Sequence, residues 1–285
     1  MYNSGGGTNQ LTLRAKFALG ALCLLAAAIA SRSTILDLSS KTFLNTGPNG
    51  PETPATVGLA FDRLKIPSHG RTLDAYLVRT PPTCQPRVAL LIFHGVMETI
   101  SEWVGAQKFL YDHCISSLVF DYSGHGDSTR PGTVGHLNDD ALPAYSTFVS
   151  QFPGERLCVV GHSMGNGPML EAVARFNPPP SCVVAANAFS SLRDAGRKRG
   201  TSAFLLYMIP DAWDNVENAK HIHIPLLVVY SDADTVNPPA MGHRIFDAAP
   251  RARQLAVLHG FPHNALYKTP SDDWWAPVLR FIQSR

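Results

Sequence analysis

Short apolar runs alternate with helix-like patterns along most of the chain. The runs occupy residues 63–66, 73–78, 88–93, 117–120, 157–160, 183–187, 226–230 and 254–258. The first two flank a His69-Gly70 turn and therefore predict a hairpin. From Val88 onward the runs are apolar without alternation, which is typical of parallel strands that are covered on both faces.

Helical patterns separate the later apolar runs and lie at residues 100–113, 141–152, 164–176, 239–248 and 272–283. A hairpin followed by repeated strand–helix units predicts an α/β fold, a mostly parallel sheet of eight strands with helices on both faces. Residues 192–224 interrupt this rhythm and predict a small lid inserted between two strands. The apolar run of the lid, residues 204–209, can receive an acyl chain or pack against the body, and we favour packing.

The first 30 residues differ in composition from the rest and contain no acidic residue. Arg14 and Lys16 precede an apolar stretch at residues 17–30, which is the pattern of an export segment. The stretch is shorter than the roughly 20 residues that span a bilayer, and Ala28-Ile29-Ala30 fits a cleavage site. We therefore expect a signal peptide and a secreted or periplasmic protein, with an uncleaved single-pass membrane anchor through residues 17–30 as the alternative.

The remaining chain is long enough for one folded domain. Residues 31–57, rich in Ser, Thr, Pro and Gly, predict a linker, and residues 58–285 predict the domain that contains the lid. An apolar fraction of 45% can fill a substantial core. With 24 Lys and Arg against 22 Asp and Glu, the charge gives no reason to expect nucleic acid as a partner, and the oligomeric state is left open.

Four cysteines lie within the predicted domain, at positions 84, 114, 158 and 182. In an oxidising compartment Cys84 can pair with Cys114 and Cys158 with Cys182, since each stands just before or early in a predicted strand. We favour free buried thiols, because a domain of this size does not need disulfides for stability.

The segment Gly161-His162-Ser163-Met164-Gly165 stands where a predicted strand must turn into a helix. A sharp turn forces its central residue into a strained backbone conformation, and small flanking residues prevent clashes. The turn exposes the Ser163 hydroxyl as a candidate nucleophile. The Met164 N–H lies at the start of the helix, where backbone donors and the helix dipole favour negative charge, so it predicts half of an oxyanion hole.

A serine hydroxyl needs a histidine base that is oriented by a carboxylate. Two acids and two histidines compete for these roles in the loops after residues 226–230 and 254–258. We choose Asp234 and His263 because Asp232 and His259 stand closer to the strand ends, and Asp232 is expected to support its loop. Asp194 is a minor alternative for the acid.

The loop after residues 88–93 reads His94-Gly95-Val96-Met97 and predicts the second oxyanion donor, the Val96 N–H. Two such donors contribute roughly 3 kcal/mol each to transition-state stabilisation. His94 is expected to hold the loop by side-chain hydrogen bonds. This chemistry implies no cofactor, and we do not favour a metal at His221 and His223, because no third ligand is evident.

Taken together, these segments resemble the α/β-hydrolase superfamily. The resemblance is carried by F-H-G at 93–95, D-Y-S-G-H-G-D-S at 121–128, G-H-S-M-G at 161–165, D-A-D-T-V-N-P at 232–238 and G-F-P-H at 260–263. Within it the chain resembles the monoacylglycerol-lipase and serine-aminopeptidase-like group, whose members often carry G-H-S-M-G-G. Asn166 departs from that pattern, because a second glycine is expected there.

The predicted function is therefore hydrolysis of carboxylic esters, small or of acyl-glycerol type, through an acyl-enzyme intermediate. The expected partner is a small-molecule or lipid acyl substrate. A serine peptidase or amidase and a thioesterase use the same residues, so they stay open as alternatives. A non-catalytic binding protein that keeps the fold is a more remote one.

Overall fold

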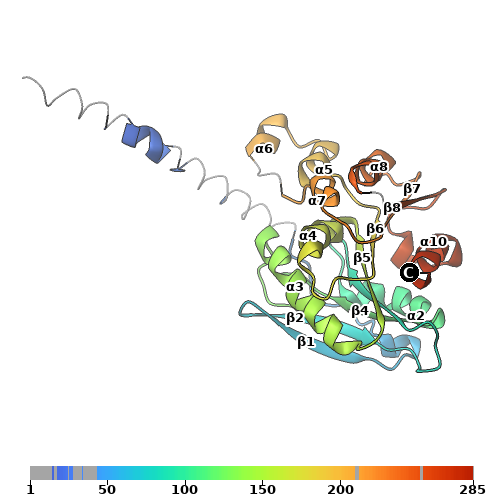
Figure 1. The fold of residues 1–285 in the computed structure, drawn as a ribbon. Coiled ribbons are helices and arrows are strands. Elements are labelled where there is room, and N and C mark those ends of the chain that lie inside the picture. Colours follow the sequence, from blue (N-terminus) through green and yellow to red (C-terminus); the bar gives the residue numbers. More distant parts are fainter. Residues whose placement is uncertain are drawn as a thin grey trace, which may run out of the picture.

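The computed structural model describes residues 15, 18–24, 26–27, 34, 44–208, 212–250 and 253–284. These residues contain one sheet of eight strands in the order β1-β2-β4-β3-β5-β6-β7-β8 (Figure 1). β1 pairs antiparallel with β2 and β2 with β4, whereas all later pairs are parallel. The strands are β1 (Asp62–Ser68), β2 (Arg71–Val78), β3 (Val88–Phe93), β4 (Ile115–Phe120), β5 (Arg156–His162), β6 (Cys182–Ala186), β7 (Leu226–Ser231) and β8 (Arg253–Leu258). The predicted fold class is confirmed.

Helices cover both faces of the sheet. One face packs against α3 (Val134–Gln151), α4 (Asn166–Ala172), α7 (Asn215–Lys220) and α8 (Pro239–Ala248). The other packs against α2 (Val104–Asp112), α9 (Ala265–Lys268) and α10 (Asp272–Gln283). The short 3-10 helices are η1 (Pro54–Val57), η2 (Ile100–Trp103), η3 (Ser163–Gly165) and η4 (Val173–Arg175).

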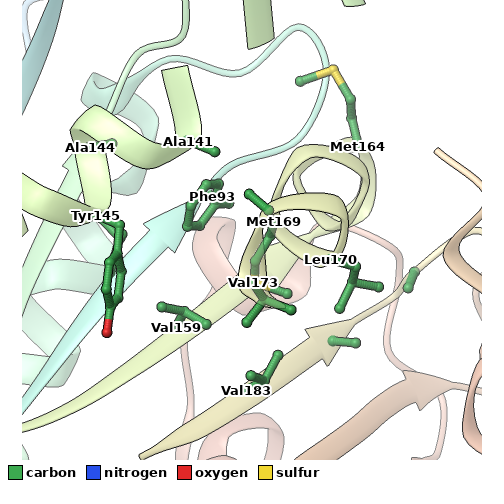
Figure 2. Packing of buried hydrophobic residues seen from close by; sticks show 14 of the residues in the cluster. Phe93, Ala141, Ala144, Tyr145, Val159, Met164, Met169, Leu170, Val173 and Val183 are labelled. Atoms are coloured by element: carbon green, nitrogen blue, oxygen red, sulfur yellow. The ribbon is translucent and has the colours of Figure 1, made fainter. Parts of the chain in front are cut away.

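The two apolar layers explain why the central strands carry uninterrupted apolar runs. Leu91 and Phe93 of β3 lie in the core beneath α3 and α4, whereas Leu90 and Ile92 lie in the core beneath α2 and α10. Figure 2 shows the first core, where Phe93 lies close to side chains of α3 and α4. Both faces of these strands therefore need apolar side chains.

Three predicted helices have different bounds in the structure. The helix predicted over residues 100–113 is divided into η2 and α2, which ends at Asp112. α3 begins at Val134, seven residues before the predicted start at residue 141, because the Thr133 hydroxyl caps it by accepting the His136 N–H at 3.1 Å. The predicted helix over 164–176 is divided into η3, α4 and η4. The helices predicted at 239–248 and 272–283 have the observed bounds of α8 and α10.

The expectation of free thiols is wrong for the four domain cysteines, which form the disulfides Cys84–Cys114 and Cys158–Cys182. Cys158 and Cys182 are direct register partners on the neighbouring strands β5 and β6, with their Cα atoms 4.9 Å apart. The size of the domain did not predict whether these cysteines form disulfides. The register of β5 and β6 places the Cys158 and Cys182 thiols side by side. Two disulfides indicate an oxidising, extracytoplasmic environment.

The packed body reaches upstream of Gly58, into the predicted linker. Leu44 is 1% exposed, and the Thr46 N–H donates to the Gly124 carbonyl at 3.0 Å. Most of the predicted export segment, residues 1–30, lies outside the described residues, although residues 18–24 and 26–27 are helical. Among the residues that are described, no helix combines the length and apolar character needed to cross a membrane.

Between β6 and β7 the chain forms three short helices, α5 (Leu192–Lys198), α6 (Ala203–Met208) and α7. Figure 1 shows them grouped beside α4. Phe204, Leu205 and Tyr207 of α6 are 70%, 49% and 73% exposed, whereas Leu206 is buried. The favoured packing of this apolar run is therefore wrong for these three side chains, and Leu206 alone among residues 204–207 turns inward.

Candidate active site

Ser163 occupies a strained turn between β5 and α4. Its φ of 50° lies in the left-handed region, as a sharp strand-to-helix turn requires. A Cβ at position 165 would lie 2.0 Å from the Phe93 carbonyl oxygen, and one at 161 would lie 2.9 Å from Asn166 Oδ1. Glycine is therefore required at 165 because the turn packs directly on the end of β3.

Asn166, which departs from the expected second glycine, is fully buried and reinforces this turn. Its Nδ2 donates to the Ser163 carbonyl at 3.1 Å and to the Ala186 carbonyl at 3.0 Å. The side-chain amide thereby ties the turn to the end of β6. This interaction is absent when glycine occupies the position.

The structure brings Ser163, His263 and Asp234 into one hydrogen-bonded line. His263 Nε2 lies 2.9 Å from Ser163 Oγ, and His263 Nδ1 lies 2.6 Å from Asp234 Oδ2. The three residues follow β5, β8 and β7, and the carboxyl ends of parallel strands share one edge of the sheet. The His263 side chain is 10% exposed and that of Asp234 is fully buried, so the line is largely shielded from water.

Backbone donors orient the Asp234 carboxylate. Its Oδ1 accepts the Val236 N–H at 2.8 Å and the Asn237 N–H at 2.9 Å, which leaves Oδ2 facing the imidazole. Asp232, two residues earlier, instead pairs with His259 at 2.7 Å, where both side chains are exposed to solvent. The two acids and two histidines thus form separate pairs, of which only Asp234–His263 reaches Ser163.

Asp194, the minor alternative for the acid, lies elsewhere. It accepts the Ser190 hydroxyl at 2.6 Å and forms ion pairs with Arg197 and, at 3.0 Å, with Arg244. Ser190 precedes α5, Arg197 lies in the last turn of α5, and Arg244 lies on α8. Its carboxylate therefore joins α5 to α8.

The environment of His263 favours the neutral imidazole. Burial and electrostatic repulsion from His162 lower its pKa below the ordinary value of 6.5, while the hydrogen bond that the imidazole donates to Asp234 opposes them without cancelling them. A neutral imidazole that accepts at Nε2 is the form that can remove a proton from Ser163. At neutral pH His263 is therefore in the form that accepts a proton.

A largely apolar pocket of about 530 Å³ opens on Ser163. It extends to α5 and α6 and is lined by Leu44, Val96, Met164, Phe189, Leu206 and Trp213, among others. Val96 and Met164, the two residues predicted to supply oxyanion donors, both line the pocket beside Ser163. A pocket of this size and character suits an acyl chain.

The loop after β3 is held by buried polar groups. His94 is fully buried, its Nδ1 lies 2.9 Å from the Gly95 carbonyl oxygen, and its Nε2 lies 3.4 Å from Asp121 Oδ1. Glu98 accepts the Gly95 N–H at 2.7 Å. Glu98 was not predicted from the sequence, because a single acid in a loop has no distinguishing pattern. The one available signal was its position three residues after Gly95, from which its side chain can reach back to the Gly95 N–H.

The histidine pair considered for a metal lies away from this pocket. His221 and His223 are exposed, and His221 Nε2 lies 3.6 Å from Glu217 Oε1. Within the part of the chain that the structure describes, no group of three or more His, Cys, Asp or Glu side chains is arranged to hold a metal ion.

Comparison with known proteins finds similar hydrolases. Residues 84–196 match the family model described as serine aminopeptidase, S33. The lysophosphatidylserine lipase ABHD12 of Danio rerio is 26% identical over 179 residues, which cover 54% of this chain and 47% of that protein. The matched region of this chain spans about half the length of the curated relatives.

Solved structures share the fold at low sequence identity. The Pyrococcus furiosus esterase Pf2001 superposes with a TM-score of 0.68 at 17% identity, over 85% of this chain and 97% of that one. The proline iminopeptidase of Mycobacterium smegmatis has a TM-score of 0.62 at 15% identity, over 78% of this chain and 98% of that one. An esterase and a peptidase thus share this fold, so the fold alone does not determine the substrate.

Proposed function

We propose that this chain, which has the α/β-hydrolase fold and resembles serine hydrolases of that kind, is a serine hydrolase whose nucleophile, base and acid are Ser163, His263 and Asp234. The observation that carries the proposal is the line from Asp234 Oδ2 through His263 to Ser163 Oγ, with distances of 2.6 and 2.9 Å. Each distance allows a direct hydrogen bond, so one proton can move from Ser163 to His263 as the hydroxyl attacks.

The reaction proceeds in two steps. Ser163 Oγ forms a bond to the acyl carbon while its proton passes to His263 Nε2, and Asp234 stabilises the resulting imidazolium. The Val96 and Met164 N–H groups stabilise the oxyanion. The ester C–O bond then breaks, and the leaving alkoxide takes the proton from His263. A water molecule finally attacks the acyl carbon while its proton passes to His263. The bond to Ser163 Oγ then breaks, His263 returns the proton to Oγ, and the carboxylic acid leaves.

Carboxylic esters, small or of acyl-glycerol type, are the proposed substrates. The apolar pocket beside Ser163 offers a place for an acyl chain, and lipases and esterases are among the similar proteins. An amide or peptide substrate is the second candidate, supported by the likeness to a serine aminopeptidase family model and to an iminopeptidase.

A fluorophosphonate probe tests the nucleophile. Wild-type protein should be labelled, Ser163→Ala should not, and His259→Gln should be labelled at the wild-type rate because His259 pairs with Asp232 away from the site. Absence of labelling in wild type, or labelling of Ser163→Ala, would refute the proposal.

A panel of p-nitrophenyl esters and aminoacyl amides then separates esterase from peptidase activity. Turnover of the amides alone would remove the esterase assignment.

We also propose that the protein is exported through residues 1–30 and that the segment is removed as a signal peptide. Support comes from the acid-free composition of this segment and from the two disulfides of the domain. Sequencing the N-terminus of the protein from its native source tests this. A start near Ser31 is expected, whereas a start at Met1 in a membrane fraction would favour the anchor.

A further inference from the structure

The backbone carbonyl of His263 accepts two side-chain hydrogen bonds. His162 Nε2 lies 3.1 Å and Asn187 Nδ2 lies 2.8 Å from the carbonyl oxygen. The donors stand at the ends of the neighbouring strands β5 and β6. We propose that His162 and Asn187, with Glu98 behind His162, are positioning residues that hold His263 in line with Ser163. This inference rests on the proposed function.

The Glu98 carboxylate joins the two loops on which the reaction depends. Its Oε1 lies 3.0 Å from His162 Nδ1, and its Oε2 accepts the Gly95 N–H at 2.7 Å and the Trp103 indole N–H at 2.9 Å. Gly95 directly precedes Val96, the proposed oxyanion donor. One buried carboxylate therefore fixes the oxyanion loop and, through His162, the loop that carries His263.

The hydrogen-bond partners of His162 require protons on both sides of its ring. A carbonyl oxygen only accepts, so Nε2 carries a proton toward His263, and a second proton lies between Nδ1 and Glu98 Oε1. A buried pair of this kind contributes little net stability compared with apolar packing. It does fix the orientation of the ring, which is what a positioning role requires.

Two backbone features make room for this arrangement. A Cβ at position 95 would lie 2.3 Å from Glu98 Oε1 and 3.2 Å from His162 Nδ1, so glycine is needed there. Asn187 has a φ of 45°, in the left-handed region that asparagine tolerates better than most residues. Its side chain thereby reaches the carbonyl of His263.

Asn187 also connects His263 to the acid. Its carbonyl accepts the Asn237 side-chain amide at 2.8 Å, and the Asn237 N–H binds Asp234 Oδ1 at 2.9 Å. Since Asp234 binds the ring of His263, the hydrogen bonds form a closed circuit around the imidazole. Loss of one donor should therefore loosen the alignment of His263 without removing any group that reacts.

His162 also acts on His263 through its charge. The two rings are 4.9 Å apart, and the positive charge of His162 helps burial to lower the pKa of His263. The other charged groups that act on His263, Asp234 and Glu98, oppose this effect. Replacing His162 with a neutral amide should therefore raise the pKa of His263.

Four full-length variants test the positioning role. His162→Leu removes both donors of the ring, His162→Gln keeps one amide donor without the charge, and Asn187→Gly keeps the left-handed backbone. Asp140→Asn is the matched control, because Asp140 is a fully buried carboxylate that accepts from Ser68 Oγ, the Ser123 N–H and Arg71, none of which lines the pocket. For each variant we would measure kcat and KM with a p-nitrophenyl ester, Tm, and the rate of fluorophosphonate labelling.

We expect kcat to fall by between about tenfold and a hundredfold in His162→Leu and Asn187→Gly with little change in KM, since misplacement by about 1 Å has an effect of that order. His162→Gln should recover part of the loss. Asp140→Asn should lower Tm but leave kcat within about twofold of wild type, because it weakens buried hydrogen bonds and the ion pair with Arg71 without touching His263 or its partners. Wild-type kcat and labelling in both His162→Leu and Asn187→Gly would overturn the inference.

A readout that does not need catalysis separates this inference from the proposed function. In the Ser163→Ala background, the imidazole of His263 is titrated by NMR, with and without His162→Gln. An upward shift of its midpoint with His162→Gln, and none with Asp140→Asn, supports the inference even where wild type fails to react with the probe. An unchanged midpoint overturns it.

Discussion

The Oδ2 atom of Asp234 lies 2.6 Å from Nδ1 of His263, whereas Asp232, two residues earlier, pairs with the exposed His259. Both pairs join the same two loops and have similar distances, at 2.6 and 2.7 Å. They differ in burial and in direction, because only the buried imidazole of His263 continues to Ser163. The structure therefore offers a natural comparison between a pair proposed to act in catalysis and one that supports a loop.

Asp234→Asn should lower kcat by about 10⁴-fold, because an amide no longer stabilises the imidazolium and favours the wrong tautomer of the histidine. Asp232→Asn should leave kcat within about twofold of wild type, since exposed ion pairs contribute little. Steady-state kinetics with a p-nitrophenyl ester measure both. Equal losses in the two variants would contradict the assignment of Asp234.

The pH dependence of kcat/KM should follow His263. Its pKa is lowered, mainly by burial and with help from the charge of His162, so the imidazole stays neutral and able to accept a proton below pH 6.5. Activity should be constant above that pH and fall at lower pH as His263 becomes protonated. A pH–rate profile with a non-ionising ester measures this midpoint, and a midpoint above 6.5 would disagree with the lowered pKa.

Patterns local in sequence predicted most of the fold. The uninterrupted apolar runs from Val88 onward indicated a sheet covered on both faces, and the structure has apolar cores on each side. Interactions between distant segments were not predictable in this way. Leu44 is buried in a segment that reads as linker, because its burial depends on residues far along the chain rather than on its neighbours.

The candidate site was likewise predictable only where local sequence patterns indicate it. Ser163, Asp234 and His263 follow predicted strands, so topology alone places them at one edge of the sheet. Glu98 and Asn187 escaped notice because their roles depend on single contacts across the fold, with His162 and with the carbonyl of His263. The residues that meet at the site were thus predictable, whereas the side chains that orient them were not.

The Cys158–Cys182 disulfide should contribute to stability more than to catalysis. The two residues are separated by 24 positions, and a loop of that length contributes about 3.5 kcal/mol to the free energy of unfolding. Cys158→Ala/Cys182→Ala should therefore unfold at lower urea concentration and keep kcat near the wild-type value. Urea titration with and without reductant measures the difference, and a wild-type midpoint in the double variant would show that the bond adds no stability.

The pocket beside Ser163 should set the preferred acyl length. Ala195 of α5 is 5% exposed and lines the pocket, so Ala195→Phe should fill the space where the end of a long chain would lie. Excluding two methylenes at about 0.8 kcal/mol each should lower kcat/KM for long-chain esters about tenfold relative to the acetate. Phe204→Ser, on the exposed side of α6, is the matched control and should leave this ratio unchanged. Equal losses for short and long esters in Ala195→Phe would instead indicate a disturbed lid and would place the acyl chain elsewhere.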